Sequence, residues 1–321
     1  MKRYKLLNNV LGWVVFVIAA VTYILTLEST ASFWDCGEFI ASGYKLEVGH
    51  PPGNPIFMLT ARFFANFASS PSEVAYMVNL MSGLLSAATI LLLFWTITRL
   101  AQKIVLREGE TEETMSLGQM IAILGCGLVG ALAYAWSDTF WFSAVEGEVY
   151  AYSSFCTALV FWLILKWESV ADLPHANRYI ILIAYIIGVS IAVHLLNLLC
   201  IPAIVLVYYY RKYKNTDLKG SLIALLVSFV LIVLLLYGLV PGFVEVAGWV
   251  ELLFVNVFHL PFNSGVVFYF FLIVGVIAWA IYETYAQRSD KLIKISFLIS
   301  IVLVGIPFIG DGYIIGIVLT A

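Results

Sequence analysis

Long apolar runs that follow one another constrain this chain more than any other feature. A transmembrane helix needs about 20 mostly apolar residues, and runs of this kind recur along the chain from residue 10 onward. Apolar residues make up 62% of the sequence and charged residues only 12%, a balance far from that of soluble domains. Barrel strands would instead give short alternating segments. The sequence therefore predicts an all-α polytopic membrane protein.

We expect about nine membrane-spanning helices within a single module that covers residues 1–321. The first apolar run follows Lys2, Arg3 and Lys5 and has no small-residue cleavage site after it, so we interpret it as a retained helix and not as a signal peptide. The chain ends in the apolar run IIGIVLTA without a flanking charge, so we expect a further C-terminal region to follow. The expected spans are 10–27, 74–98, 118–136, 149–165, two short helices within 179–210 that meet near His194, 221–240, 265–284, and a helix from 295 that breaks at Pro307 or within 310–312.

Positive residues lie almost entirely on one side of this layout. Of the 17 Lys and Arg residues, only Lys45 and Arg62 fall in segments that we place outside. Because Lys and Arg favour cytoplasmic loops, we predict a cytoplasmic N-terminus in the inner membrane, with the loops 28–72 and 241–264 facing the periplasm. In the second of these loops, residues 248–260 are expected to form an amphipathic segment at the membrane interface. The acidic residues of the chain then gather at the outer face.

The first outer loop holds much of the polar chemistry, and we interpret it as the catalytic loop. Asp35 and Glu38 are three residues apart, so they share one face if the segment is helical. The neighbouring Phe33, Trp34 and Phe39 would partly bury these acids and raise their pKa values toward those of a general base. We therefore predict that both acids are catalytic. Two solvated loop carboxylates are the alternative, and the spacing alone leaves it open.

The run HPPGNP, residues 50–55, follows in the same loop and cannot form a regular helix. It is expected to turn the chain into an amphipathic helix over 56–67. His50 can donate to a phosphate or a carboxylate, and with Asn54 and Arg62 it is predicted to bind substrate. A purely structural turn is at least as consistent with the prolines.

Two further polar pairs lie near the ends of spans. Glu146 and Glu148, in the string SAVEGEVYAY, could face Asp35 across a site, although acids at a helix N-terminus are also favoured by the helix dipole. His194 and Asn197 interrupt an apolar run, and polar groups at membrane depth are functional candidates by default. An interhelical hydrogen bond is the competing explanation. All four are predicted substrate-binding residues.

No metal or other cofactor is predicted. Oxygen and nitrogen ligands are offered by Asp35, Glu38, His50, Glu146 and His194, but no ligand spacing supports a particular site. The four cysteines lie far apart without a CxxC pair, which predicts neither a disulfide framework nor a cysteine metal site. The sequence contains no phosphate-binding glycine loop, GxSxG elbow or HExxH string. Nucleic-acid binding has no support.

The order of these features resembles that of polytopic glycosyltransferases of the GT-C fold, which have a short cytoplasmic N-terminus, a first helix and a large first outer loop with acidic residues and amphipathic helices. The strings FWDCGEFIASGYKLEVGHPPGNP and VEGEVYAY resemble more narrowly the bacterial membrane family related to the animal transmembrane O-mannosyltransferase of plexin-type receptor domains. The resemblance implies a GT-C-like bundle, a polyprenyl-phosphate-linked sugar donor and a Ser or Thr acceptor in an exported protein. The first-loop catalytic acid of the family falls on Asp35, with Glu38 as its neighbour.

An inverting mechanism follows as a hypothesis, with Asp35 taking the proton of the acceptor hydroxyl. His50, Arg62 and His194 are the candidates for stabilising the departing lipid phosphate. Histidine stands at position 194, where GT-C enzymes frequently carry lysine. The polyprenyl tail would lie between helices.

Two alternatives differ in class. The chain could be a transporter or flippase for a lipid-linked or anionic substrate, in which Asp35, Glu146 and His194 couple transport. Transporters usually repeat their halves and place ionisable groups at the midplane, whereas here the acids gather in outer loops and no halves repeat. A transferase with a lipid or glycan acceptor is the second alternative, because no motif identifies the acceptor.

Overall fold

The computed structural model describes residues 2–51, 53–286 and 289–304, and this part of the chain is helical without any strand. It divides into two compact units, residues 1–221 and 222–321. Seven of its helices are long and apolar enough to cross a membrane. The prediction of an all-α polytopic membrane protein is confirmed.

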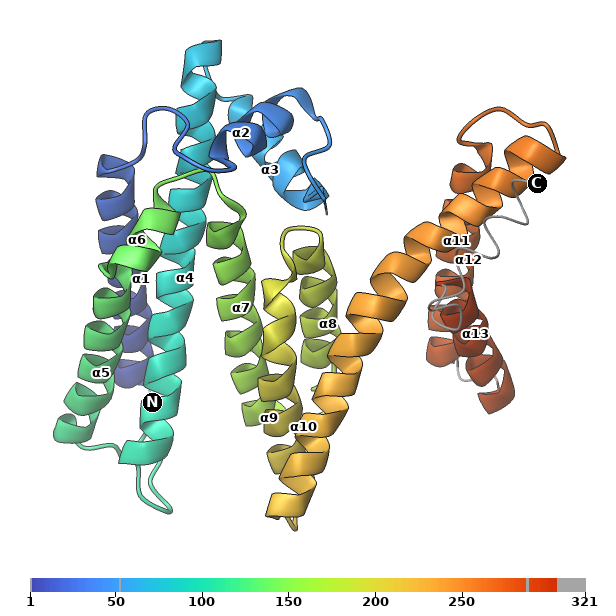
Figure 1. The fold of residues 1–321 in the computed structure, drawn as a ribbon. Helices are drawn as coiled ribbons and strands as arrows, with labels where there is room; N and C mark the ends of the chain where they lie inside the picture. The colour runs from blue at the N-terminus through green and yellow to red at the C-terminus, as the bar shows by residue number, and fades with distance from the viewer. Residues whose placement is uncertain (1, 52, 287–288, 305–321) are drawn as a thin grey trace. The chain divides into compact units, whose positions relative to one another are not determined.

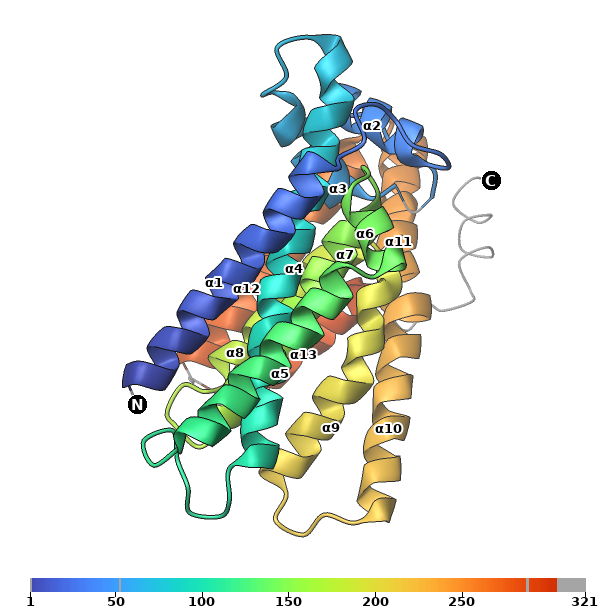
Figure 2. The same ribbon diagram turned by 90° about the vertical axis from the view of Figure 1, so that its left-hand side faces the viewer.

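The first unit contains the candidate site and is built around α4 (Val74–Val105), which contacts α1, α5 and α7 (Figure 1). Figure 2 shows α1, α4 and α5 side by side along their lengths. The other elements of this unit are α1 (Lys2–Leu25), α2 (Cys36–Lys45), α3 (Pro55–Ala65), η1 (Pro71–Glu73), α5 (Leu117–Ala135), α6 (Asp138–Ala144), α7 (Val149–Val170), α8 (Arg178–Ile191), η2 (Leu195–Cys200) and α9 (Ile201–Lys212).

Small residues let α4 and α5 approach closely. A Cβ atom added at Gly127 would lie 2.5 Å from Thr98 Cγ2 and 2.8 Å from Phe94 Cε2, and one at Gly130 would lie 2.7 Å from Ile97 Cδ1. Transmembrane helices pack through such small residues because lipid provides no hydrophobic drive for association. The outward faces of these helices carry many exposed large apolar side chains, as a lipid-facing surface requires.

The helices α2 and α3 form a cap at one end of the first unit, and the N-terminus of α1 lies at the other end (Figures 1 and 2). The underside of this cap is apolar, with Phe57 of α3 packing in one buried cluster with Val78 of α4, Val149 of α7 and Val193. The Ile56 backbone N–H donates to the Ala192 carbonyl at 3.1 Å. The cap therefore packs against α4, α7 and the non-helical segment that follows α8.

The second unit begins within one long helical stretch. This stretch comprises α10 (Leu218–Val233), the π-helical segment η3 (Leu234–Leu239), α11 (Val240–Leu252) and the π-helical segment η4 (Leu253–Val257). A turn leads from it to α12 (Ser264–Ala286), and α13 (Asp290–Leu303) follows.

The predicted loop over 241–264 is a helix through most of its length. Pro241 falls in the first turn of α11, directly after η3. A π-helical turn before a proline accommodates both the missing N–H and the ring, so the helix continues where the sequence predicted a stop. The interfacial segment expected over 248–260 is likewise helical up to Val257.

The predicted spans agree with the structure over most of the chain. The seven long helices correspond to seven of the expected spans. The break near His194 is confirmed, since α8 ends at Ile191 and η2 begins at Leu195; α8 itself has only 14 residues. The amphipathic helix expected over 56–67 is α3. The expected break at Pro307 or within 310–312 lies outside the described residues.

Candidate active site

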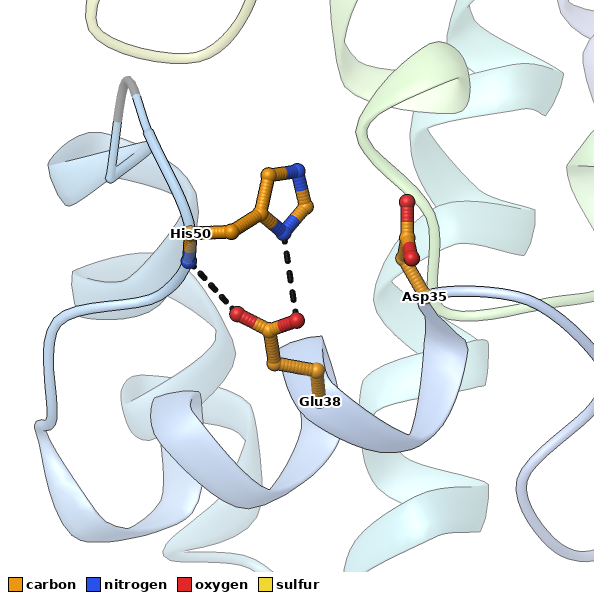
Figure 3. Close-up of side chains that lie close together, drawn as sticks. All are labelled: Asp35, Glu38 and His50. Carbon is orange, nitrogen blue, oxygen red and sulfur yellow. Dashed lines mark hydrogen bonds and ion pairs between the residues drawn. The ribbon is translucent and has the colours of Figure 1, made fainter.

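Asp35, Glu38 and His50 lie together at the exposed face of the cap. Asp35 is the N-cap residue of α2, and Glu38 is in its first turn. The chain leaves α2 through Leu46 in the left-handed conformation, with φ of 57°, and returns to place His50 beside Glu38. The His50 backbone N–H donates to Glu38 Oε1 at 2.6 Å, and His50 Nδ1 lies 3.1 Å from Glu38 Oε2. Figure 3 shows Asp35 near this pair, at the N-terminal end of the helix that carries Glu38.

The contacts with His50 favour the ionised form of Glu38. The His50 backbone N–H, followed by its side chain, lowers the pKa of Glu38 below its usual value, so Glu38 is an ionised carboxylate near neutral pH. The prediction that flanking aromatic rings bury these acids is wrong. Phe33 is 82% exposed and Trp34 is 90% exposed, and only Phe39 is buried, beneath the His50 ring. A pKa raised by burial is therefore not found at Glu38.

The same three side chains offer a set of metal ligands. One ligand atom from each of Asp35, Glu38 and His50 lies within 4.8 Å of the other two, and all three residues are exposed. Two carboxylates and an imidazole suit several divalent cations. The spacing in the sequence did not indicate this set, because the third member comes from the loop that returns after α2.

Glu146 and Glu148 lie in the connection between α6 and α7 and are each only 5% exposed. Burial raises the pKa of Glu148 to about 7, and the charges of Glu146 and Asp35 contribute to this rise. Burial also raises the pKa of Glu146. The sequence predicted that these residues could face Asp35, and the electrostatic coupling of Glu148 to Asp35 agrees with that arrangement. Raised carboxyl pKa values were expected at Asp35 and Glu38 in the first loop, and they are found instead at Glu146 and Glu148.

Close packing holds this acidic connection against the cap. A Cβ atom added at Gly147 would lie 3.0 Å from Asn79 Oδ1 and 3.2 Å from Ile40 Cγ1. Asn79 is buried on α4, and its Nδ2 donates to the Glu28 carbonyl at 2.7 Å and the Thr30 carbonyl at 3.1 Å. Sequence reasoning missed Asn79, although an amide near the start of an apolar span was a signal that could have identified it.

His194 lies at the same end of the first unit as the cap. It is the N-cap residue of η2, and its Nδ1 accepts from the Leu196 backbone N–H at 3.2 Å. Its ring centroid lies 5.5 Å from that of Tyr150, in the first turn of α7, two residues after Glu148. Burial lowers the pKa of His194, so the ring is neutral near pH 7.

Of three other predicted substrate-binding residues, Asn197 and Arg62 have structural partners, whereas the buried Asn54 Oδ1 has no hydrogen-bond partner among the described residues. Asn197 is fully buried, and its Oδ1 accepts from Thr157 Oγ1 at 3.3 Å, which is the interhelical bond named as the competing explanation. Asn54 is 3% exposed and adopts a left-handed backbone before α3. Arg62 donates to the Tyr44 carbonyl, at the opposite end of α2 from Asp35 and roughly 13 Å along the helix axis. Arg62 therefore ties α2 to α3.

A family match covers this region. The model of the family described as protein O-mannosyl-transferase TMEM260 N-terminal domain matches residues 35–217. The chain belongs to this family. The matched segment begins at Asp35 and contains every predicted site residue. The sequence-based resemblance to the animal O-mannosyltransferase is thereby confirmed.

Two relatives show how much of the chain is shared. The mouse protein O-mannosyl-transferase TMEM260 is 27% identical over 209 residues, which cover 65% of this chain and 27% of the mouse protein. The Dictyostelium discoideum protein O-mannosyl-transferase tmem260 is 23% identical over 189 residues, which cover 57% of this chain and 20% of that protein. The match thus spans about a quarter of the length of these relatives. No solved structure matches the chain.

Proposed function

We propose that this chain is the membrane part of a protein O-mannosyltransferase. It would move a mannose-like sugar from a polyprenyl-phosphate donor to a Ser or Thr hydroxyl of an exported protein. The observation that carries the proposal is that the family match begins at Asp35, a carboxylate exposed beside Glu38 and His50 on the cap of a helical membrane bundle. The orientation proposed from the Lys and Arg distribution puts this cap at the periplasmic face of the inner membrane.

The reaction assigns Asp35 the role of general base. As the acceptor hydroxyl oxygen forms a bond to the anomeric carbon, Asp35 takes the hydroxyl proton, and the bond from that carbon to the phosphate oxygen breaks. The polyprenyl phosphate leaves with the bonding electrons, so a single displacement inverts the anomeric centre. Glu38, kept ionised and fixed by His50, is the second carboxylate of the site.

The leaving phosphate needs hydrogen-bond donors. His194 is a candidate because its Nδ1 accepts from the Leu196 N–H, which leaves the proton of the neutral ring on Nε2, free to donate. His50 is the second candidate. Arg62 is a more distant candidate, since it donates to the Tyr44 carbonyl at the end of α2 opposite Asp35. In this scheme Glu148 is coupled to Asp35 through their charges.

A transfer assay with Asp35→Asn tests the proposal. Membranes containing the full-length natural protein would be given labelled polyprenyl-phosphate mannose and a periplasmic acceptor protein. Loss of a general base should slow transfer by about 10²-fold or more. Glu47→Gln is the matched control, because Glu47 is an exposed acid of the same loop whose ion pair is the 3.9 Å contact with exposed Lys45.

The outcomes separate cleanly when both variants are compared at equal expression and equal thermal stability. Wild-type transfer by Asp35→Asn would refute the base assignment. Activity without the polyprenyl-phosphate donor would refute the donor class. The same assay with EDTA tests whether Asp35, Glu38 and His50 hold a metal ion. Loss of transfer with EDTA and its rescue by a divalent cation would add a metal to the mechanism.

A further inference from the structure

A polar cavity lies at the end of the first unit opposite the cap, where the N-terminal part of α1 meets α4 and α7. Its volume is about 460 Å³. Lys5 and Asn8 of α1, Trp95 and Arg99 of α4, and Trp162 and Lys166 of α7 are among the residues that line it. None of them belongs to the candidate active site, and the proposed reaction uses none of them. We call this cavity the α1–α4–α7 pocket.

Positive charge exceeds negative charge in the lining. Lys5, Arg99 and Lys166 face a single lining carboxylate, Glu112, which lies 3.6 Å from Lys5 Nζ. Arg99 is 3.7 Å from Glu168, which also pairs with Lys103 outside the lining. Lys166 is different, because no carboxylate of the described residues lies within 4 Å of its Nζ. The pocket thus has a cation available for an anionic ligand.

The rest of the lining matches the boundary between headgroups and acyl chains. The Lys166 Nζ lies 5.1 Å from the centroid of the Trp162 ring, and the Trp95 and Trp162 ring centroids are 5.9 Å apart. Trp95 Nε1 donates to the Asn8 carbonyl at 3.3 Å. Tryptophan is enriched at this depth because its ring is apolar and its N–H is polar. Asn8 Oδ1 is buried without a hydrogen-bond donor among the described residues, so a hydroxyl on a ligand could satisfy it.

We propose that the α1–α4–α7 pocket binds the phosphate-bearing headgroup of an anionic phospholipid. Basic pockets between transmembrane helices bind such headgroups through their phosphate groups. Lys166 and Arg99 would contact the phosphate, and Asn8 would accept from a headgroup hydroxyl. The site is separate from the proposed donor site, because it lies at the opposite end of the first unit. A soluble phosphate compound shares this chemistry and is distinguished by the test.

The test titrates the purified full chain in detergent with phosphatidylglycerol or phosphatidylcholine, and reads the thermal unfolding midpoint and the lipid retained in native mass spectrometry. We expect phosphatidylglycerol to stabilise the wild-type protein, with an apparent affinity about fivefold lower in Lys166→Gln. Lys5→Gln is a second variant, since both lysines are exposed and neither change threatens the fold. Lys214→Gln is the matched control, an exposed lysine in the loop after α9.

Two further arms decide the source of the phosphate. If inorganic phosphate or glycerol phosphate gives the same Lys166-dependent stabilisation, the pocket takes a soluble phosphate and the lipid proposal is overturned. Equal stabilisation by the two lipids, or equal effects of Lys166→Gln and Lys214→Gln, would also overturn it. Failure of the transferase assay leaves this outcome unchanged, because the pocket is tested by binding alone.

Discussion

At the scale of single residues, the acids near the cap fall into two groups with opposite environments. Asp35 and Glu38 are exposed, and Glu38 is held ionised by His50. Glu146 and Glu148 are 5% exposed, and burial raises the pKa of Glu148 to about 7. Asp35 and Glu38 are therefore accessible to a substrate. Burial favours the protonated form of both buried acids, and they lie in the packing that supports the cap.

Glu148→Gln should make the protein less sensitive to pH. A carboxyl whose pKa rises from 4.5 to about 7 on folding binds its proton more tightly in the folded state, so wild-type stability falls as the pH rises through this window. Gln resembles the protonated acid and does not titrate. We expect Glu148→Gln to match the wild type near pH 4.5 and to exceed it by about 3 kcal/mol at pH 8.

Thermal unfolding between pH 4.5 and 8 measures this difference. Glu47→Gln should show the same profile as the wild type, because it changes an acid whose side chain is 60% exposed. If Glu148→Gln follows the wild-type curve at every pH, Glu148 is not the buried titrating group described above.

At the scale of elements, the site depends on how tightly α2 and α3 pack. A Cβ atom added at Gly43 of α2 would lie 2.7 Å from the Cβ of Ala61 on α3, which is fully buried. Ala61 has no flexible end that could move aside. Arg62 reinforces the pair through the Tyr44 carbonyl and lies over the Tyr44 ring. This packing holds the loop that carries His50 back to Glu38.

Gly43→Ala should therefore separate the two helices. We expect a loss of about 1–3 kcal/mol from overpacking, together with weaker transferase activity as His50 moves from Glu38. Gly37→Ala is the control on the same helix, since a Cβ there would meet only Ala31 at an ordinary 3.9 Å. The control should be neutral or stabilising by up to about 1 kcal/mol. Equal thermal stability of the two variants would argue against close packing at Gly43.

At the scale of the whole molecule, seven long apolar helices among the described residues define a membrane protein, and its first unit carries polar residues at both ends. One end of the first unit carries the cap, and the other carries the α1–α4–α7 pocket. The proposed orientation assigns the cap to the periplasm and the pocket to the cytoplasmic leaflet. The two proposed sites would then lie on opposite sides of the membrane.

Cysteine labelling tests this orientation. A membrane-impermeant maleimide should label Glu47→Cys in intact cells, whereas Lys214→Cys should be labelled only after the membrane is opened. The wild-type chain provides the baseline, because Cys36, Cys156 and Cys200 are buried and Cys126 lies in the apolar helix α5. The reverse labelling pattern would show that the cap faces the cytoplasm.

The helices themselves follow from local properties of the chain. Apolar length predicted the long spans, the polar pair in 194–197 predicted the break after α8, and the prolines of residues 50–55 predicted the turn before α3. These features depend on hydropathy and on backbone restrictions within a few residues, which can be read from the sequence directly. The long helix through Pro241 is the exception, because a π-helical turn relieves a local conflict.

The candidate site depended on contacts between distant residues. Glu38 meets His50 because α2 ends at Leu46 and the chain folds back, and this contact lowers the pKa that flanking aromatics were expected to raise. Glu148 is buried in the connection between α6 and α7, and Arg62 donates to the Tyr44 carbonyl because α3 packs beside α2. Burial and hydrogen bonding set the charge and the availability of each side chain. Both arise only when separate helices come together, so the sequence predicted which polar residues to consider and the tertiary structure decided what each can do.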